Sequence, residues 1–201
     1  MDEFELSSII VVNLDGVVKG ILSLKEIKYV NDLSKSIKSI LGVETQVKWP
    51  NDIMMNGKKV AGMLVNASFQ ANNIDYLVLG VGINFDVDVK KLEKKLSKSP
   101  NFYGVNSLRK KDDNTSPTVL LREFLLQFEK VLVQLNKGEK SKIVKEWTKR
   151  ADRIGKKITI NTSNGEISGI SHGIDNDGAL KLKTAKEMKK IFVGDVVSSQ
   201  V

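Results

Sequence analysis

An Asn-Gly dipeptide between two apolar runs constrains the fold more than any other feature of this sequence. Asn56-Gly57 is typical of a two-residue β-hairpin turn, because both residues tolerate a positive φ. Upstream, Pro50 fixes its own φ and disfavours a helical conformation for Trp49, so a strand that ends there meets a rigid corner. Residues 47–68 are therefore predicted to run as strand, corner, hairpin and strand, and the rest of the chain is expected to be arranged around them.

Three polar side chains lie on this predicted corner. Asn51 and Asp52 are short enough to bond their own backbone, which closes a turn after the proline. Lys48 ends the preceding strand, so an ammonium, an amide and a carboxylate are expected close together. Such a group suits a reaction that involves a phosphate group and Mg²⁺, because Mg²⁺ binds oxygen ligands and phosphate binds cations. The plainer interpretation of each residue, a strand end or a turn cap, stays open at this point.

The composition is ordinary for a globular protein and excludes several kinds of site. Hydrophobic residues make up 41% and charged residues 28% of the 201 positions. No apolar run approaches the ~20 residues that a membrane span needs, and the acidic start Met1-Asp2-Glu3 is unlike a secretory signal. The absence of cysteine and the single histidine exclude disulfides, thiolate sites and multi-histidine metal centres. We expect a cytoplasmic protein.

Basic residues outnumber acidic ones along the whole chain. The formal net charge is +8 and the pI is about 9.5. This charge favours anionic partners such as nucleotide phosphates, an acidic protein or nucleic acid. The lysines are scattered rather than gathered on one segment, however, so a solvated basic surface explains the charge equally well.

The apolar pattern predicts a strand and a helix before the corner. Residues 6–14 are compact and β-branched, as in a buried strand, and Asp15-Gly16 ends that strand as a turn. From residue 24 to 41, apolar residues recur at spacings of three and four while lysines fill the opposite face. This pattern predicts an amphipathic helix packed on a sheet, and Gly42 is placed to end it.

A second hairpin is predicted from residues 60–69 and 76–85. Gly80 and Gly82 alternate with aliphatic residues in its latter strand, so both glycines lie on one face, where a ligand can approach the backbone closely. The pattern is not a dinucleotide-binding fingerprint, because the third glycine and the following helix are missing.

Helices are predicted in the next part of the chain. Residues 86–117 are polar and are expected to form a loop over the sheet, with a short helix at 88–97. Ser116-Pro117 is expected to cap a helix that runs to residue 136, and Gly138 follows near its end. The predicted apolar stripe of this helix consists of Leu121, Phe124, Leu125, Phe128, Val131, Leu132 and Leu135. A further helix is predicted to run to residue 150.

Four short strands are predicted after Ile154, at residues 157–162, 166–174, 179–183 and 189–197, and Gly194-Asp195 is expected to interrupt the last of them. Their even spacing and their Asn-Gly and Asp-Gly turns suggest a small β-barrel. We therefore predict an α+β domain with a mixed β-sheet over residues 1–152 and a small β-barrel over residues 153–201.

Three ordered motifs and the tail resemble the biotin–protein ligase family. The motifs are Lys48-Trp49-Pro50-Asn51-Asp52, Gly57-Lys58-Lys59-Val60-Ala61-Gly62-Met63-Leu64-Val65 and Gly80-Val81-Gly82-Ile83-Asn84. The tail, from Gly169 to Leu180 and then Gly194-Asp195-Val196, resembles the small C-terminal barrel of that family. The resemblance spans nearly the whole chain. It implies a catalytic domain of the class II synthetase and biotin ligase type, followed by an SH3-like barrel.

The sequence departs from the family at its start. Family members begin with a further segment that carries a loop of the form Gly-Arg-Gly-Arg-x-x-Arg, which closes over biotin and the adenylate. No Gly-Arg-Gly occurs in this sequence, and Val105-Asn106-Ser107-Leu108 is the nearest match to the family's Ala-Thr-Ser-Leu motif. The intact downstream motifs favour a split enzyme, whose complementing chain brings the loop, over a truncated gene product or a descendant that kept only a binding role. The winged-helix DNA-binding domain of some bacterial members is absent too, so no repressor function is expected.

The resemblance implies that biotin reacts with Mg-ATP to form biotinyl-adenylate, and that biotin then passes to a lysine of a biotin carboxyl carrier domain. Lys48 is the implied catalytic residue, bridging the biotin carboxylate and the α-phosphate as a point charge. Asn51, Asp52 and Asn84 are implied to bind ATP and its phosphates, with Asp52 as a magnesium ligand. The implied biotin pocket consists of Lys48, Trp49, Gly62, Leu64, Gly80 and Gly82.

Other interpretations stay open. Lys59 is better interpreted as a solvated hairpin lysine, and Trp49 as a core residue or a pocket wall. The nearest alternative function is a lipoate-type ligase of the same fold, and an alternative of another class is a non-catalytic module that binds a carrier or nucleic acid. The Trp-Pro-Asn-Asp corner and the barrel favour biotin. A homodimer is expected by analogy with related ligases, whereas membrane and nucleic acid are not expected partners.

Overall fold

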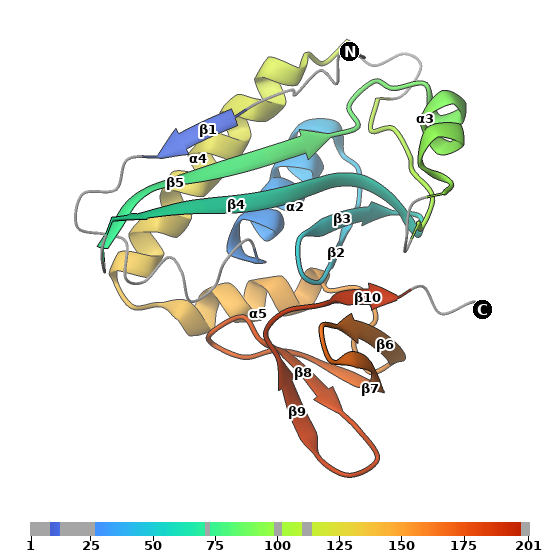
Figure 1. The fold of residues 1–201 in the computed structure, drawn as a ribbon. Coiled ribbons are helices and arrows are strands. Elements are labelled where there is room, and N and C mark those ends of the chain that lie inside the picture. The colour runs from blue at the N-terminus through green and yellow to red at the C-terminus, as the bar shows by residue number, and fades with distance from the viewer. Residues whose placement is uncertain (1–8, 13–26, 71–72, 99–101, 110–113, 198–201) are drawn as a thin grey trace.

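The predicted hairpins assemble into a five-stranded sheet (Figure 1). The structure, a computed structural model, describes residues 9–12, 27–70, 73–98, 102–109 and 114–197. The strands of this first sheet are β1 (Ile9–Val12), β2 (Gln46–Lys48), β3 (Asp52–Met55), β4 (Lys58–Gln70) and β5 (Asn73–Ile83). They lie in the order β1-β5-β4-β3-β2, and each pair of neighbours is antiparallel.

Both predicted hairpins are confirmed. Asn56 and Gly57 join β3 to β4 with φ values of 52° and 73°, a region that few other residues tolerate. Strands β4 and β5 pair from their turn to Ala61 and Ile83. The strand predicted at 6–14 is described only as β1, and its other residues and the Asp15-Gly16 turn lie outside the described residues.

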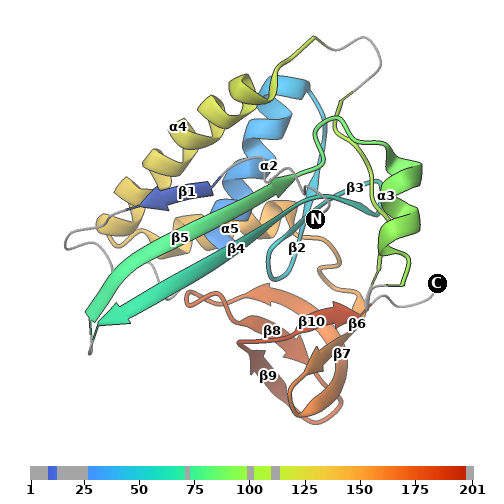
Figure 2. The same ribbon diagram turned by 45° about the horizontal axis from the view of Figure 1, so that its top comes forward.

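Helices cover one face of this sheet. They are α2 (Ile27–Leu41), α4 (Pro117–Asn136) and α5 (Lys140–Arg150), while the short α3 (Val89–Leu96) lies at one end. Figures 1 and 2 show α2 and α4 on the same side of β4 and β5, and no helix among the described residues lies over the other side. The strands alternate accordingly, because successive side chains point to opposite faces: Met63 and Val81 are buried, whereas Leu64 is 55% exposed. The first sheet therefore has one covered face and one open face.

The end of α2 lies where the sequence predicts it, but the buried face of α4 differs from the prediction. Gly42 ends α2 with a φ of +64°, and its N–H donates to the Lys38 carbonyl at 3.0 Å. In α4, the predicted stripe is partly wrong, since Leu125 is 41% exposed and Leu120 is buried in its place. The apolar positions surround α4, so spacing alone did not decide which of them face the sheet.

The second sheet is formed by residues 157–197, near the end of the chain. Its strands are β6 (Lys157–Thr162), β7 (Gly165–Ile174), β8 (Leu180–Lys183), β9 (Met188–Ile191) and β10 (Asp195–Val197). They lie in the order β10-β6-β7-β8-β9, again antiparallel. The interruption predicted at Gly194-Asp195 is confirmed, because the predicted segment 189–197 belongs to two strands, β9 and β10, on opposite edges of the sheet. The small β-rich module is confirmed, while its closure into a barrel and the division at residue 152 stay predictions.

The two sheets meet close to the Trp-Pro corner. The indole N–H of Trp49 donates to the Gly178 carbonyl at 3.2 Å, and the Asp152 amide donates to the Val47 carbonyl at 2.8 Å. Isolated parallel bridges join Val47 to Ala151 and Lys59 to Val105. Together with the antiparallel ladders, they give the mixed pairing expected of this α+β fold.

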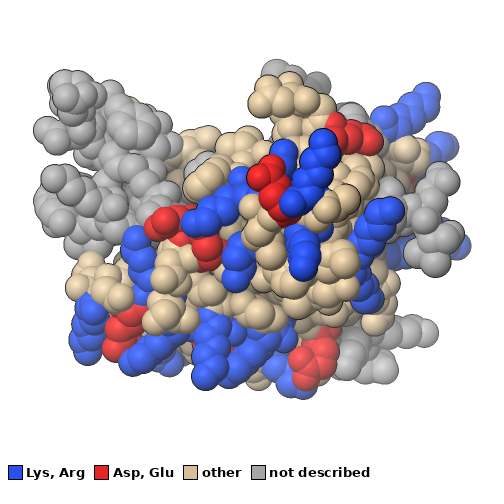
Figure 3. Space-filling view, turned by 90° about the horizontal axis from the view of Figure 1, so that it is seen from below, with Lys and Arg blue, Asp and Glu red and all other residues tan. Residues whose placement is uncertain are grey.

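Charged side chains are spread over the surface. Figure 3 shows one face on which blue Lys and Arg side chains are distributed widely, with red acidic side chains among them. None of the helices in the described residues is long and apolar enough to cross a membrane.

Candidate active site on the open face of the first sheet

One row of residues crosses four neighbouring strands at the end of the first sheet. Lys48 on β2 is the register partner of Asp52 on β3, Asp52 is the partner of Gly62 on β4, and Gly62 is the partner of Gly82 on β5. Residues directly opposite in an antiparallel ladder share a face, and Gly82 is exposed. The row therefore lies on the open face, with a lysine and a carboxylate at one end and two glycines at the other.

Lys48 is a buried cation in this row. The residue is only 5% exposed, and its Nζ lies 3.4 Å from Oδ2 of Asp52. Burial lowers the pKa of Lys48, while the neighbouring Asp52 carboxylate opposes that shift. A desolvated ammonium interacts with an anion more strongly than a solvated one does, so the site favours a negatively charged ligand.

Asp52 is shared between two lysines. Its Oδ1 lies 2.5 Å from Nζ of Lys59, and its Oδ2 faces Lys48. Lys59 is half-exposed, yet it is held in the site rather than being only the solvated hairpin lysine that the sequence favoured. Two ammonium groups around one carboxylate leave this cluster with a net positive charge, which again favours an anionic ligand.

The Asp52 carboxylate does not fit the predicted role of a magnesium ligand. Both of its oxygens already face an ammonium group, and a divalent cation there would be repelled by two positive charges. The described residues also contain no cluster of three acidic, histidine or cysteine side chains that could hold a metal. Any magnesium used here would accompany the nucleotide, whose phosphates supply its oxygen ligands.

Tyr103 completes the surroundings of Lys48. The Nζ of Lys48 lies 3.9 Å from the centroid of the Tyr103 ring, within the range of a cation–π interaction. The hydroxyl of Tyr103 is buried without a hydrogen-bond partner among the described residues, and burial raises its pKa to about 12. The tyrosine thus presents a neutral aromatic face to the ammonium.

Sequence reasoning missed Tyr103, because it assigned residues 86–117 to a loop with no specific role. The backbone after Tyr103 runs beside Lys59: the Lys59 amide donates to the Gly104 carbonyl at 3.1 Å, and the Asn106 amide donates to the Lys59 carbonyl at 2.9 Å. The one sequence signal for this placement was the altered family motif at 105–108, which begins two residues after Tyr103.

The side chains of Asn51 and Asn84 both donate hydrogen bonds to the backbone of β4. The side-chain amide of Asn51 donates to the Met63 carbonyl at 2.7 Å, and that of Asn84 donates to the Lys59 carbonyl at 3.2 Å. The expectation that Asn51 and Asp52 bond their own turn is therefore wrong, because the Asn51 amide bonds β4 and both Asp52 oxygens face lysines. Their assignment to ATP stays a prediction.

The glycines leave the open face without side chains. A Cβ on Gly62 would lie 3.0 Å from Cε and Nζ of Lys59, so the absence of a side chain makes room for the Lys59–Asp52 pair. A Cβ on Gly82 would meet nothing nearer than 3.9 Å, and one on Gly80 nothing nearer than 3.5 Å. The exposed Leu64 shares this face, and the four residues form a smooth floor that a flat ligand could approach.

Trp49 does not share this floor. The residue is 4% exposed and belongs to the hydrophobic core, and its indole N–H bonds the second sheet. The sequence left two roles open for Trp49, a core residue or a pocket wall. This placement favours the core residue.

Two family models match the chain, one in each half. The Biotin/lipoate A/B protein ligase family matches residues 4–84, and the Biotin protein ligase C terminal domain matches residues 154–198. The first match contains the whole Lys48 row, and the second contains the second sheet.

Curated relatives agree with these models. The chain is 30% identical to the bifunctional ligase/repressor BirA of Bacillus spizizenii, over 81% of this chain and 49% of that protein. It is also 30% identical to the biotin–[acetyl-CoA-carboxylase] ligase of Paracoccus denitrificans, over 68% of this chain and 56% of the relative. The chain thus spans about half the length of the curated relatives that it matches.

Solved structures share the fold. The biotin protein ligase of Aquifex aeolicus superposes with a TM-score of 0.74 at 18% identity, covering 94% of this chain and 80% of that one. A structure of the same enzyme in complex with biotin and ATP gives a TM-score of 0.71 at 19% identity, covering 94% and 75%. Because a biotin/lipoate ligase model and a biotin protein ligase C-terminal model match successive parts of the chain, and the curated relatives include a biotin–[acetyl-CoA-carboxylase] ligase, the chain belongs to the biotin protein ligase family.

Proposed function

We propose that this chain carries the catalytic centre of an ATP-dependent biotin–protein ligase. The observation that supports this most directly is the buried Lys48 ammonium, held by Asp52 and covered by Tyr103, beside a floor of glycines. A fixed cation next to open backbone suits a reaction in which a carboxylate and a phosphate meet.

In the first proposed step, an oxygen of the biotin carboxylate attacks the α-phosphorus of ATP. A bond forms between that oxygen and phosphorus, the bond to the bridging oxygen breaks, and pyrophosphate leaves. Lys48 contacts the carboxylate and the α-phosphate, and it stabilises the negative charge that grows on the phosphoryl oxygens. Its burial strengthens this interaction, because the local dielectric constant is low.

In the second proposed step, the neutral amine of a carrier lysine attacks the acyl carbon of biotinyl-adenylate. An amide bond forms, the acyl–phosphate bond breaks, AMP leaves, and the amine loses a proton. Negative charge now develops on the acyl oxygen and on the leaving phosphate, so Lys48 lowers this barrier as well. The carrier is proposed to be a biotin carboxyl carrier domain, and the reaction to take place in the cytoplasm.

The substrates are proposed to occupy the open face of the first sheet. Gly62, Gly80 and Gly82, with Leu64, would form the floor under biotin, because they leave the backbone accessible. Asn51 and Asn84 would face the nucleotide at the ends of the neighbouring strands. Trp49 would support this pocket from the core rather than contact biotin.

A complementing polypeptide is proposed to supply the biotin-covering loop. No Gly-Arg-Gly sequence occurs in the 201 residues, and the family's loop of that form closes over the adenylate. With the Lys48 row in place, such a loop added in trans would restrict the loss of biotinyl-adenylate from the open face.

Biotin is favoured over lipoate as the substrate. The family model that matches the first half covers both biotin and lipoate ligases, whereas the model that matches residues 154–198 is specific to biotin protein ligases. The lipoate-type ligase is the second candidate, and it predicts the same role for Lys48.

The test is a biotinylation assay with biotin, Mg-ATP and a carrier domain, with and without a polypeptide that carries the Gly-Arg-Gly-Arg loop. We expect carrier labelling that depends on that polypeptide and is lost in Lys48→Ala, whereas Lys94→Ala on α3 keeps it. A parallel assay with lipoate and a lipoyl domain discriminates the second candidate. No labelling in any reaction, with no binding of biotin or ATP by calorimetry, would overturn the enzymatic proposal.

A further inference from the structure

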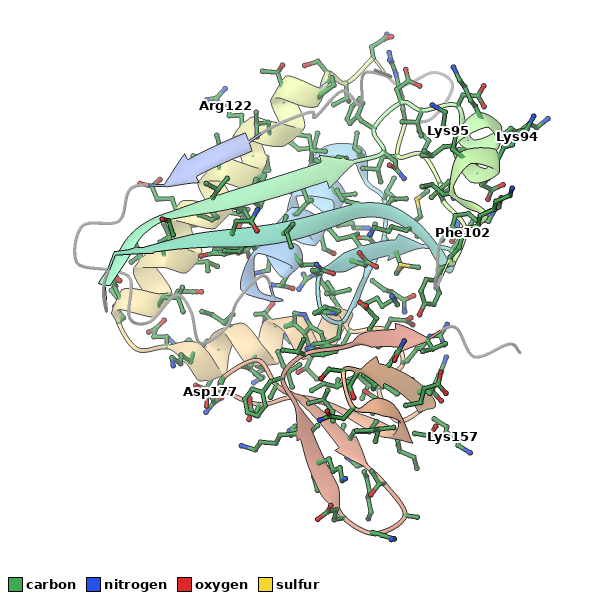
Figure 4. All side chains as sticks on the ribbon, viewed as in Figure 1. Lys94, Lys95, Phe102, Arg122, Lys157 and Asp177 are labelled. Carbon is green, nitrogen blue, oxygen red and sulfur yellow. The ribbon has the colours of Figure 1, made fainter. Side chains whose placement is uncertain are left out.

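A row of exposed side chains crosses four strands of the second sheet. Lys157 on β6 lies opposite Ile170 on β7. Lys183 on β8 lies opposite Ile170 and, on its other side, opposite Met188 on β9. All four are exposed, Ile170 by 42% and Met188 by 49%, and Figure 4 shows Lys157 extending outward from the sheet. Because residues directly opposite in a ladder share a face, cationic and apolar side chains alternate across what we call the outer face of the second sheet.

The hairpin of β8 and β9 adds to the positive charge of this face. Five of the ten residues 181–190 are lysines, and Glu187 is the one acidic residue among them. Residues 185–190 are all exposed, and Figure 1 shows the hairpin projecting away from the first sheet. Figure 3 views the molecule from the side on which the hairpin lies, and blue side chains are more widespread there than red ones. The fold thus gathers lysines that are scattered along the sequence.

Protection of the sheet edge explains only part of this charge. Strand β9 is an edge strand of the described sheet, and lysines on an edge strand hinder its pairing with another chain. This accounts for Lys189 and Lys190. It does not account for Lys181 and Lys183 on β8 or for Lys157 on β6, because both of these strands lie inside the sheet.

Most lysines of this surface have no acidic partner among the described residues. Lys189 pairs with Glu187 at 3.6 Å, and Lys190 pairs with Asp175 at 2.8 Å. In the part of the chain that the structure describes, no ion pair involves Lys157, Lys181, Lys183 or Lys186. Their ammonium groups are therefore available to an anion outside the chain.

The shape and chemistry of the surface select the kind of anion. Lys157 and Lys183 stand two strands apart, about 10 Å, so one phosphate group cannot meet them all. Apolar side chains lie among the lysines: Ile170, Met188 and also Phe192, which follows β9 directly and is 59% exposed. A nucleic acid offers phosphates but leaves these apolar side chains in water. A membrane with anionic lipids offers phosphates at its surface and hydrocarbon just beneath them.

We propose that the outer face of the second sheet, with the β8–β9 hairpin, binds the surface of a membrane that contains anionic lipids. The lysines contact lipid phosphates, and Ile170, Met188 and Phe192 enter the boundary between headgroups and acyl chains. The association is peripheral, reversible and weakened by salt. The Lys48 row belongs to the first sheet, from which the hairpin projects away (Figure 1), so both surfaces can be occupied together. From the sequence, a membrane was not an expected partner.

The first test is sedimentation of the full chain with lipid vesicles. We expect binding to vesicles in which about a third of the lipid is phosphatidylglycerol, and none to pure phosphatidylcholine. Lys181→Gln/Lys183→Gln should lower the partition coefficient ~25-fold, since each lysine near an anionic surface contributes about 5-fold. Lys90→Gln/Lys91→Gln on α3 removes the same charge elsewhere and should change binding less than ~2-fold. Circular dichroism verifies that each variant is folded.

The second test asks whether the apolar side chains enter the lipid, and it uses the absence of cysteine from the chain. Met188→Cys is labelled with a fluorophore whose emission depends on polarity. The emission should shift to shorter wavelength on anionic vesicles, because the label leaves water. Val119→Cys on α4, which is 47% exposed in the wild type, carries the same label away from the proposed surface and should show no shift.

Four results would overturn the proposal. The wild type might bind neither kind of vesicle, or the α3 control might lose as much binding as the hairpin variant. A bound chain whose Met188→Cys label does not shift would mean that the apolar side chains stay in water. Binding of a duplex DNA of ~20 base pairs through Lys181 and Lys183, without binding to anionic vesicles, would identify a nucleic-acid surface instead. These readouts do not depend on ligase activity.

Discussion

Glycines stand inside both sheets, but a side chain added to them would meet different surroundings. In the first sheet, a Cβ on Gly82 would come no nearer than 3.9 Å to another residue. In the second sheet, a Cβ on Gly169 would lie 2.6 Å from the Lys183 carbonyl oxygen and 2.8 Å from Cγ of Leu182. Real Cβ atoms do not approach backbone that closely.

The same residue type therefore does two different things in one chain. At Gly80 and Gly82 of the first sheet, glycine keeps a face empty that a ligand can occupy, and no neighbouring atom requires glycine there. In the second, glycine lets neighbouring strands β7 and β8 approach, and the fold depends on it. The comparison predicts that changes in the first sheet lower activity at constant stability, and that changes in the second sheet lower stability.

Lys48→Ala should have the largest effect and should spare the fold. We expect kcat/KM for biotinylation to fall about 10³-fold, equivalent to about 4 kcal/mol of transition-state stabilisation. Asp52 keeps its pair with Lys59, so the free energy of unfolding should change little. The measurement is a carrier biotinylation assay with the complementing polypeptide, alongside urea unfolding. Activity within a few-fold of the wild type would contradict the assignment of Lys48.

The two regions should also respond to pH in opposite directions, and Asp32 should dominate. This carboxyl on α2 is 1% exposed, and burial raises its pKa from 3.8 to about 7, only partly offset by Lys35 and Arg150. Its favourable contribution is complete below pH 3.8 and is lost as the pH rises through about 7, by an amount on the order of 4 kcal/mol. Asp32→Asn should flatten this loss in urea unfolding curves between about pH 4 and pH 8.

Asp175, in the turn between β7 and β8 of the second sheet, is the matched comparison. Burial would raise its pKa, but the Lys190 ammonium at 2.8 Å and two backbone amides outweigh burial and lower the pKa. Its contribution is present above the unfolded pKa and is lost as the pH falls through the lower folded value. In the Asp175→Asn variant, the free energy of unfolding should therefore no longer fall because of this group as the pH is lowered. If Asp32→Asn and Asp175→Asn changed the pH dependence of unfolding in the same direction, the two carboxyl groups would not differ as proposed.

Gly169→Ala should destabilise the protein by about 1–3 kcal/mol, because the added methyl group overlaps the backbone of β8. Urea unfolding measures the change directly. Gly165→Ala, at a position where the added Cβ meets nothing within 4 Å but φ is +103°, separates overlap from backbone strain. An unchanged midpoint for Gly169→Ala would show that β7 and β8 can move apart at little cost.

Tyr103→Leu should lower kcat/KM about 10-fold, because leucine keeps Lys48 desolvated but removes the aromatic face. The pKa of Lys48 should fall further, which moves the alkaline limb of the pH–rate profile to lower pH. Tyr103→Phe keeps the ring and should restore both the rate and the profile. Equal losses in the two variants would assign the effect to the hydroxyl group instead.

Gly82→Ala should have the smallest effect, and only on binding. The methyl group would stand in open space on the sheet face, so stability should stay within ~0.5 kcal/mol of the wild type. We expect the KM for biotin to rise about 5-fold with little change in kcat, since ground state and transition state are affected equally. Loss of stability without a change in KM would mean that Gly82, like Gly169, is needed for strand packing rather than for ligand binding.

Local signals predicted most of the secondary structure. The hairpin turn at Asn56-Gly57, the end of α2 at Gly42 and the start of α4 at Pro117 all depend on the φ preferences of single residues. Such preferences act within a few residues, so one sequence is sufficient to read them. The stripe of α4 was predicted less well, because apolar residues on both of its sides satisfy the same spacing.

The sequence by itself also determined which motifs are predicted to form the site, since Lys48, Asp52, Gly62 and Gly82 all lie in stretches that resemble one enzyme family. Only the tertiary structure decided how these residues meet. The register of four strands aligns them in one row and places Asp52 between Lys48 and Lys59, and the later loop brings the Tyr103 ring over Lys48. The physical reason is that these contacts depend on how strands pair and on the approach of a distant loop, and a register shift of one residue would turn each side chain to the opposite face.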